Sequence, residues 1–198
     1  MTTCSGKENY RRAITFSSPE YLPVRLSVYF PWLQEEDEGK RRRIDELAAA
    51  FPDDFYEADP AMTLRPPQLV DGVLRWTDEW GVDWASEGRG IKPCSHPLLS
   101  GYDALGSYSF PDPGAPDRFL DIDQALASRG EKYVLGWVWF TLFERLWMLR
   151  GFENMLTDPR LHPVEFAALR DRVLEFDLAL IDRWLERRAD GIFFSDDW

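Results

Sequence analysis

Three polar residues directly follow a short apolar run near the end of the sequence. Ser195, Asp196 and Asp197 come after the run Ile-Phe-Phe at 192–194, and such a run is typical of a buried strand. A carboxylate at the end of a strand can stabilise a positive charge that develops on a substrate, or exchange a proton with it. The pattern therefore predicts Asp196 and Asp197 as catalytic residues, with Ser195 as a substrate-binding residue beside them.

A further carboxylate with this potential is Asp78, in the sequence WTDEWGVDW. We expect a strand within residues 72–83, and we expect Asp78 to line the same concave surface as Asp196. Trp80, two residues after Asp78, is a candidate aromatic contact for a substrate. Trp76, Trp80 and Trp84 recur every four residues, which fits a helical stripe, whereas Gly81 favours a strand and a turn; the two interpretations stay open.

Thr141 and His96 are two further candidates for binding a substrate. Thr141 and Glu144 have the spacing of a capping box, which predicts a helix that begins just after a strand. The free N–H groups of its first turn could bind a carboxylate or phosphate, although ordinary capping explains Thr141 equally well. His96 could contact a substrate or stabilise its loop. Cys94 and His96 lie close in sequence, but zinc needs three or four ligands, so no metal site is predicted.

The elements that must position these residues alternate between strands and helices. Helices are expected over residues 8–14 and 40–50, from Thr141 with a break near Gly151, and from Pro163 to about residue 186. Besides the strand within 72–83, strands are expected at 23–30, 132–139 and from 192. Residues 51–71 show no clear period, and 85–118 read as a long ordered excursion. This order predicts an α/β fold with parallel strands and crossover helices.

Composition limits the class of protein and its partners. With 198 residues, of which 44% are hydrophobic, the chain can form one domain with a real core. Its net charge of −12 argues against nucleic acid or an anionic membrane surface as a partner. Two cysteines make no disulfide framework, and the first residues do not resemble a signal peptide. The longest uncharged apolar stretch, 133–143, is too short to span a bilayer. We therefore expect a cytoplasmic protein.

Three blocks of the sequence together resemble the uroporphyrinogen decarboxylase superfamily. They are WTDEWGVDW followed by HPLLSGYDALGSYSFPDP, then GWVWFTLFERLWMLRGFENML, then ADGIFFSDDW. They are most similar to the methyltransferase-like members outside haem synthesis. The resemblance implies a (β/α)₈ TIM barrel, of which residues 1–198 would form the N-terminal half, with the C-terminal half missing. It also implies that Asp78 matches the superfamily's catalytic aspartate.

The resemblance implies an enzyme of corrinoid-linked methyl transfer or demethylation, acting on a small molecule and served by a corrinoid protein as partner. Corrinoid and zinc would belong to the full-length protein, and no cofactor is expected in this chain, which by itself would be inactive. The first alternative is uroporphyrinogen decarboxylase, the carboxy-lyase of porphyrin biosynthesis. Against it, the acidic SVYFPWLQEEDEG stands where that enzyme has an arginine-rich loop. The second alternative is a non-catalytic half-barrel that binds a ligand or a partner.

Overall fold

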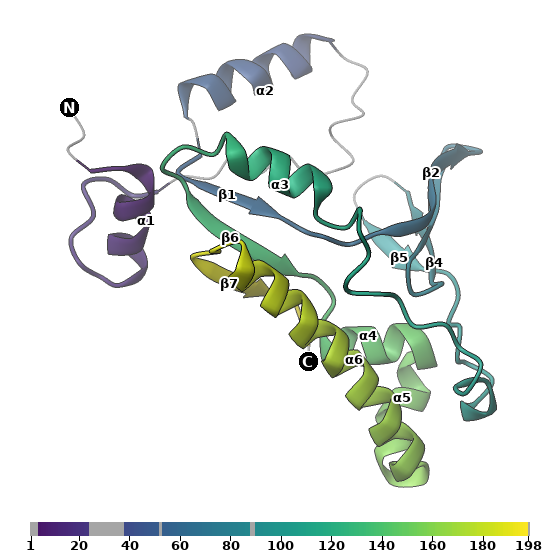
Figure 1. Cartoon of the computed structure of the whole chain (residues 1–198). Coiled ribbons are helices and arrows are strands. Elements are labelled where there is room, and N and C mark those ends of the chain that lie inside the picture. The colour runs from purple at the N-terminus through teal and green to yellow at the C-terminus, as the bar shows by residue number, and fades with distance from the viewer. Residues whose placement is uncertain (1–3, 24–37, 52, 88–89, 198) are drawn as a thin grey trace.

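The protein combines two sheets with helices in one mixed α/β fold (Figure 1). The structure is a computed structural model and describes residues 4–23, 38–51, 53–87 and 90–197. Of the strand expected at 23–30, residues 24–30 lie outside these ranges. Within them, no helix has the length and apolar character needed to cross a bilayer.

The first sheet is parallel and has three strands. They are β1 (Phe55–Ala58), β6 (Tyr133–Val138) and β7 (Gly191–Phe194), in the order β1-β6-β7. The α/β prediction with parallel strands is confirmed for this sheet, and so are the strands expected at 132–139 and from 192. Strand β1 was not predicted, because four residues are too few to establish a period among the prolines of 51–71.

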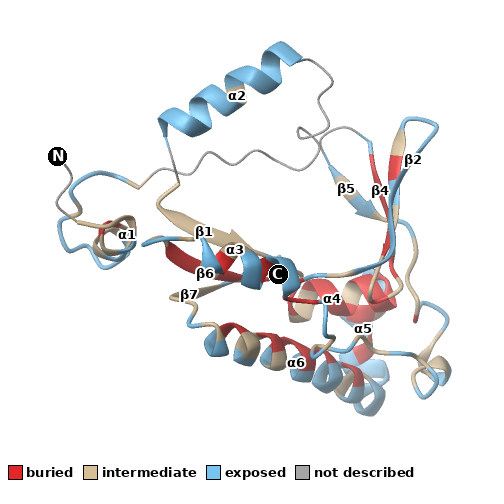
Figure 2. Cartoon of the chain, turned by 45° about the horizontal axis from the view of Figure 1, so that its top comes forward, coloured by how far each residue is buried: buried red, intermediate tan, exposed pale blue. Residues whose placement is uncertain are grey.

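Three helices connect β6 to β7, and the last of them packs on one face of this sheet. They are α4 (Leu142–Arg150), α5 (Phe152–Leu161) and α6 (Pro163–Glu186). The expected break at Gly151 is confirmed by its φ of 80°. Helix α6 buries one apolar stripe along its length, as the red face in Figure 2 shows. The stripe consists of Leu169, Val173, Phe176, Leu180 and Trp184.

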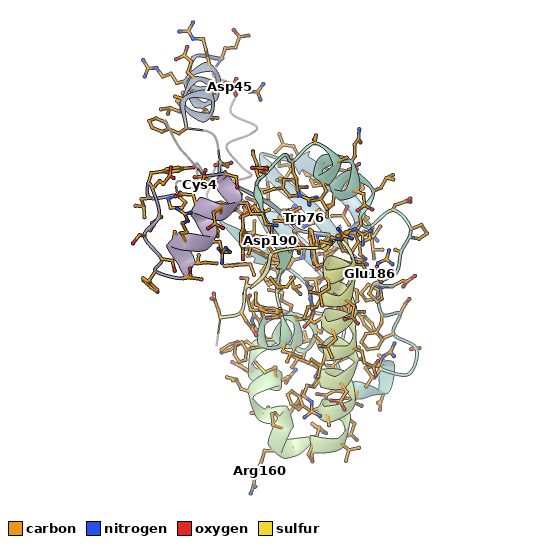
Figure 3. All side chains as sticks on the ribbon, turned by 60° about the vertical axis from the view of Figure 1, so that its left-hand side comes forward. Cys4, Asp45, Trp76, Arg160, Glu186 and Asp190 are labelled. Carbon is orange, nitrogen blue, oxygen red and sulfur yellow. The ribbon has the colours of Figure 1, made fainter. Side chains whose placement is uncertain are left out.

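Helix α1 (Gly6–Ile14) lies at the amino ends of the three strands. The ring of Tyr10 is 5.0 Å from that of Phe55 and 4.6 Å from that of Tyr133. Lys7 forms an ion pair with Asp190, which directly precedes β7 and lies beside α1 in Figure 3. Helix α2 (Glu38–Ala50) has no buried residue, and the short α3 (Leu120–Ala127) was not predicted.

The second sheet is antiparallel, which corrects the prediction of parallel strands throughout. It contains β2 (Thr63–Val70), β3 (Val73–Asp78), β4 (Asp83–Ser86) and β5 (Ile91–Pro93), in chain order. WTDEWGVDW forms the β3–β4 hairpin, whose turn includes Gly81 at a φ of 75°. Trp76 and Trp84 face each other across it, with stacked rings 6.0 Å apart. Of the two interpretations of the tryptophan spacing, the strand and turn is therefore confirmed, and the helical stripe is excluded. Tight antiparallel pairing needs only this short turn, whereas a parallel pair needs a long crossover.

Close contact between β6 and α6 depends on Gly136. The indole of Trp184 is fully buried against this strand, and its Nε1 donates to the carbonyl oxygen of Trp137 at 3.1 Å. A Cβ atom at position 136 would lie 2.5 Å from the indole ring. Any side chain at this position would therefore push helix and sheet apart.

We expect Gly136→Ala to lower the free energy of unfolding by about 1–3 kcal/mol, because the added methyl group overpacks the core. Gly106→Ala is the matched control, since a Cβ atom there meets nothing within 4 Å. Urea denaturation of both variants measures the effect. Equal stabilities of the two variants would contradict the close packing of Trp184 on β6.

Candidate functional site

The carboxyl ends of the parallel strands meet the first turn of α4 and the middle of α6. Open parallel sheets bind their ligands at this end of the strands. Six charged residues gather there, and we call them the strand-end cluster. They are Asp59, Asp78, Glu144, Arg145, Asp177 and Asp196.

Arg145 is the fixed positive charge of the strand-end cluster. Arg145 is buried, with 6% of its surface exposed, and its Nη1 donates to Asp78 Oδ2 at 2.9 Å. The guanidinium carbon lies 4.9 Å from the ring centre of Trp80 and 5.6 Å from that of Phe140. These aromatic faces and the carboxylate together hold a charge that would be costly to bury alone.

Asp78 uses both of its carboxylate oxygens within the protein. Oδ1 accepts from the backbone N–H groups of Trp80 at 3.0 Å and Val82 at 2.9 Å. Oδ2 accepts from Trp84 Nε1 at 3.1 Å and from Arg145. A carboxylate has about four acceptor positions, so this geometry favours a role in which Asp78 positions Arg145. The predicted direct catalytic role of Asp78 stays a prediction.

Asp196 caps helix α4, and this corrects the predicted capping box. Its carboxylate accepts from the backbone N–H of Phe143 at 3.1 Å and of Glu144 at 2.8 Å. Thr141 does stand at the N-cap, but its hydroxyl donates to the carbonyl oxygen of Ser195 at 3.3 Å. A full negative charge at a helix N-terminus outcompetes a hydroxyl. The N–H groups of Phe143 and Glu144, which could have bound a substrate anion, instead donate to Asp196.

Two carboxyls of the cluster are buried. Glu144 and Asp177 are each 7% exposed. Glu144 Oε2 has no hydrogen-bond partner among the described residues. Desolvation raises the pKa of Glu144 to about 7, helped by the nearby charges of Asp197 and Asp196. Desolvation likewise raises the pKa of Asp177 to about 7; Arg145 opposes the shift and Asp196 adds to it.

Asp177 lines a small cavity together with Arg145, Trp80 and Asp59. The volume is about 20 Å³, which is room for one water molecule. Asp59 also lines this cavity but is exposed to solvent. The cavity thus brings the buried acid Asp177 and the guanidinium of Arg145 to one small space.

The structure does not bring all the predicted residues to the cluster. Trp80 does line the cavity, with its ring edge-to-face at 4.8 Å from Phe176. His96 lies at the other end of α4, where its Nδ1 is 2.8 Å from the carbonyl oxygen of Met148. This contact attaches the loop of His96 to the helix. Asp197 is exposed and acts on the cluster only through its charge.

Sequence reasoning missed the acid of α6 and the arginine of α4. Asp177 falls on the apolar stripe of α6, next to Phe176 and four residues after Val173. A charged residue on a buried helix face is the signal that could have revealed it. Arg145 was not among the predicted site residues, because its ion pair with Asp78 of β3 joins residues 67 positions apart in the sequence.

Within the described ranges, no three His, Cys, Asp or Glu side chains are arranged to hold a metal ion. Comparison with family models, with curated proteins and with solved structures finds no match to this chain. The functional assignment therefore rests on the strand-end cluster and on the sequence.

Removing the cap should destabilise the protein. We expect Asp196→Ala to lower the free energy of unfolding by about 0.5–2 kcal/mol, because two N–H groups of α4 lose their acceptor. The free energy of unfolding should be measured near pH 5 by urea denaturation, because Glu144 and Asp177 are protonated there and do not repel Asp196. Asp197→Ala, which removes an exposed carboxylate, should change stability by less than about 0.5 kcal/mol. Equal losses in the two variants would contradict the cap.

The raised pKa of Asp177 predicts how stability depends on pH. The carboxyl ordinarily titrates at 3.8 but in the folded protein at about 7. Between these values the folded state holds a proton that the unfolded state has released, so the free energy of unfolding falls as pH rises and levels off above about 7.

Asp177→Asn cannot titrate, and its unfolding free energy should fall less steeply between about pH 4 and pH 7, by up to about 1.4 kcal/mol per pH unit. Asp182→Asn replaces an exposed acid of the same helix and serves as the control. Urea denaturation across this pH range provides the curves. Parallel curves for wild type and Asp177→Asn would refute the raised pKa.

Proposed function

We propose that the strand-end cluster is the acid–base centre of an enzyme that acts on a small organic molecule. The observation that carries the proposal is the pair of buried acids, Glu144 and Asp177, with pKa values near 7 beside the buried Arg145. A carboxyl with such a pKa can both give and accept a proton at neutral pH. The guanidinium can stabilise negative charge that develops on a substrate oxygen.

We further propose that the enzyme is of the uroporphyrinogen decarboxylase type and that its sheet is part of a (β/α)₈ barrel. The order β1-β6-β7 follows the chain, as it does in a barrel. Helix α6 covers one face of the sheet, and α1 packs at the amino ends of the strands. The other face carries Trp137 and Phe193, with ring centres 4.6 Å apart, and would face the barrel interior.

Within this superfamily, corrinoid-linked methyl transfer or demethylation is the reaction that we propose. When the methyl group leaves a substrate oxygen, that oxygen needs a proton, and protonated Asp177 can supply it. A corrinoid bound on a partner protein would supply the methyl-accepting cobalt. The cavity of the strand-end cluster does not fit a tetrapyrrole, since its volume is about 20 Å³. We therefore derive no step through the corrinoid. Cys4 and Cys94 are both free thiols, which fits the proposed cytoplasmic location.

Decarboxylation of a porphyrinogen is the second candidate reaction. Its support is the same pair of proton-exchanging acids. Against it stands Asp78, the match to the superfamily's aspartate, because all four acceptor positions of this carboxylate are occupied. Pyrrole N–H groups would find no free acceptor there. A ligand-binding protein without catalysis is the remaining alternative.

Turnover by acid variants tests the proposal. The complete protein of the natural reading frame is assayed for methyl transfer from methoxylated aromatic compounds to cob(I)alamin, and for decarboxylation of uroporphyrinogen. Asp177→Asn and Glu144→Gln should each lower kcat at least about 100-fold, because general acid–base catalysis contributes this much. Asp182→Asn should keep wild-type turnover. Wild-type kcat in Asp177→Asn and Glu144→Gln would contradict the acid–base role, and turnover of uroporphyrinogen alone would favour the second candidate.

A further inference from the structure

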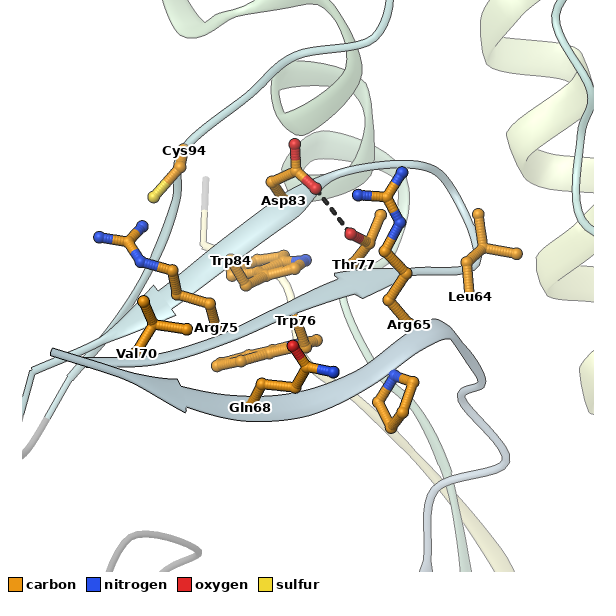
Figure 4. A pocket seen from close by; sticks show the side chains of 11 residues that line it. Leu64, Arg65, Gln68, Val70, Arg75, Trp76, Thr77, Asp83, Trp84 and Cys94 are labelled. Carbon is orange, nitrogen blue, oxygen red and sulfur yellow. Dashed lines mark hydrogen bonds between the residues drawn. The ribbon is translucent and has the colours of Figure 1, made fainter. Parts of the chain in front are cut away.

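The solvent-facing side of the antiparallel sheet carries an open groove of about 550 Å³ (Figure 4). This volume is in the range of small-molecule sites. The polar side chains of the groove project from the face of the sheet opposite to Leu74, which is buried. The groove shares no lining residue with the cavity of the strand-end cluster. A ligand bound in it would therefore be additional to the substrate of the proposed enzyme.

Strand register brings the polar residues of the groove onto one face. Arg65 of β2 pairs with Thr77 of β3, Gln68 pairs with Arg75, and Thr77 pairs with Asp83 of β4. Paired residues project from the same face of a sheet, and so do residues two apart on one strand. A register shift between Arg65 and Gln68 accommodates the extra residue on β2, so both side chains reach the groove.

The two arginines of the groove have no acidic partner within the described ranges. The buried arginines, by contrast, each bind a carboxylate: Arg118 with Glu79, Arg145 with Asp78 and Arg150 with Asp158. Asp83 is the one carboxylate among the groove's lining residues, and it accepts a hydrogen bond from the Thr77 hydroxyl at 2.6 Å. The guanidinium groups of Arg65 and Arg75 lie on opposite sides of the groove in Figure 4, with space between them. Two such cations without an acidic partner stand out in a chain of net charge −12.

We propose that this groove binds the oxyanion of a small organic molecule, a carboxylate or a phosphate ester. Guanidinium groups match the planar, bidentate geometry of such anions. Arg65 and Arg75 provide the charge and the Gln68 amide a further donor. Leu64, Pro66 and Val70, which also line the groove, provide apolar contact for the carbon body of the ligand.

An extended peptide that joins the sheet is a poorer occupant. Strand β2 lies at the edge of the sheet and is exposed along its whole length, so its edge could in principle pair with another strand. Pro66 and Pro67 interrupt this edge, and a proline has no N–H to donate to a ladder. The groove must therefore recognise its ligand through side chains.

Cys94 provides a reporter inside the groove. Its thiol is exposed and lines the groove, whereas Cys4 is half-buried beside α1. A ligand seated between Arg65 and Arg75 would slow alkylation of Cys94 by iodoacetamide and leave the rate at Cys4 unchanged. Mass spectrometry of the two cysteine peptides reports both rates in one sample.

The probes are benzoate, phenyl phosphate and the neutral benzamide, each up to about 10 mM, where a site of millimolar Kd is largely occupied. We expect benzoate or phenyl phosphate to slow alkylation of Cys94 at least about threefold and benzamide to have no effect. Protection by benzoate assigns a carboxylate ligand, and protection by phenyl phosphate a phosphate ester. Protection should vanish in Arg65→Gln/Arg75→Gln, whose replaced side chains are exposed.

Arg160→Gln is the matched control, because Arg160 is exposed near the end of α5, far from the groove in Figure 3. It should keep full protection. The proposal is overturned if neither anion protects Cys94, if benzamide protects it as well as the anions do, or if the double variant is protected like the wild type. Equal thermal unfolding of the three proteins verifies that the variants are folded.

Discussion

The buried ion pair between Asp78 and Arg145 joins the two halves of the fold. Asp78 ends β3 of the antiparallel sheet, and Arg145 lies in the first two turns of α4, which follows the parallel sheet. An ion pair in such a position is costly unless every donor and acceptor is satisfied. Here two backbone N–H groups and the Trp84 indole donate the remaining hydrogen bonds to the Asp78 carboxylate, and aromatic rings cover the guanidinium of Arg145. The hairpin and the helix therefore keep a fixed relative position.

That fixed charge determines the electrostatics of the strand-end cluster. Arg145 is the single cation among six charged residues, and Asp78 already uses it. Glu144 and Asp177 must then be buried next to the carboxylate of Asp196 without a cation of their own. Burial and like charge both disfavour ionisation, so the protonated forms persist to near-neutral pH. Glu144, in the first turn of the helix that Asp196 caps, is thus protonated up to near-neutral pH because of its burial and the charges of Asp197 and Asp196.

Sequence patterns predicted the elements with strong periodicity and missed those defined by tertiary contacts. The apolar run of β6, the break at Gly151 and the stripe of α6 are local features, and each was predicted within a few residues. Strand β1 has four residues and is a strand only because it pairs with β6. Among the predicted site residues, Asp78, Trp80, Thr141 and Asp196 lie at or beside the cluster, whereas His96 does not. Asp177 lies on the predicted buried stripe of α6, but its importance depends on Arg145 and Asp196, which only the tertiary structure brings close to it.

Titration of the two buried acids, Glu144 and Asp177, measures whether they remain protonated near neutral pH. Carbon-13 NMR of the side-chain carboxyls, with Asp177→Asn and Glu144→Gln used to assign the signals, follows each group from about pH 3 to pH 9. We expect Asp177 and Glu144 both to titrate with apparent pKa values near 7, coupled through Asp196. Titration of both carboxyls near pH 4, as in exposed acids, would show that burial does not keep them protonated and would remove the basis of the acid–base centre.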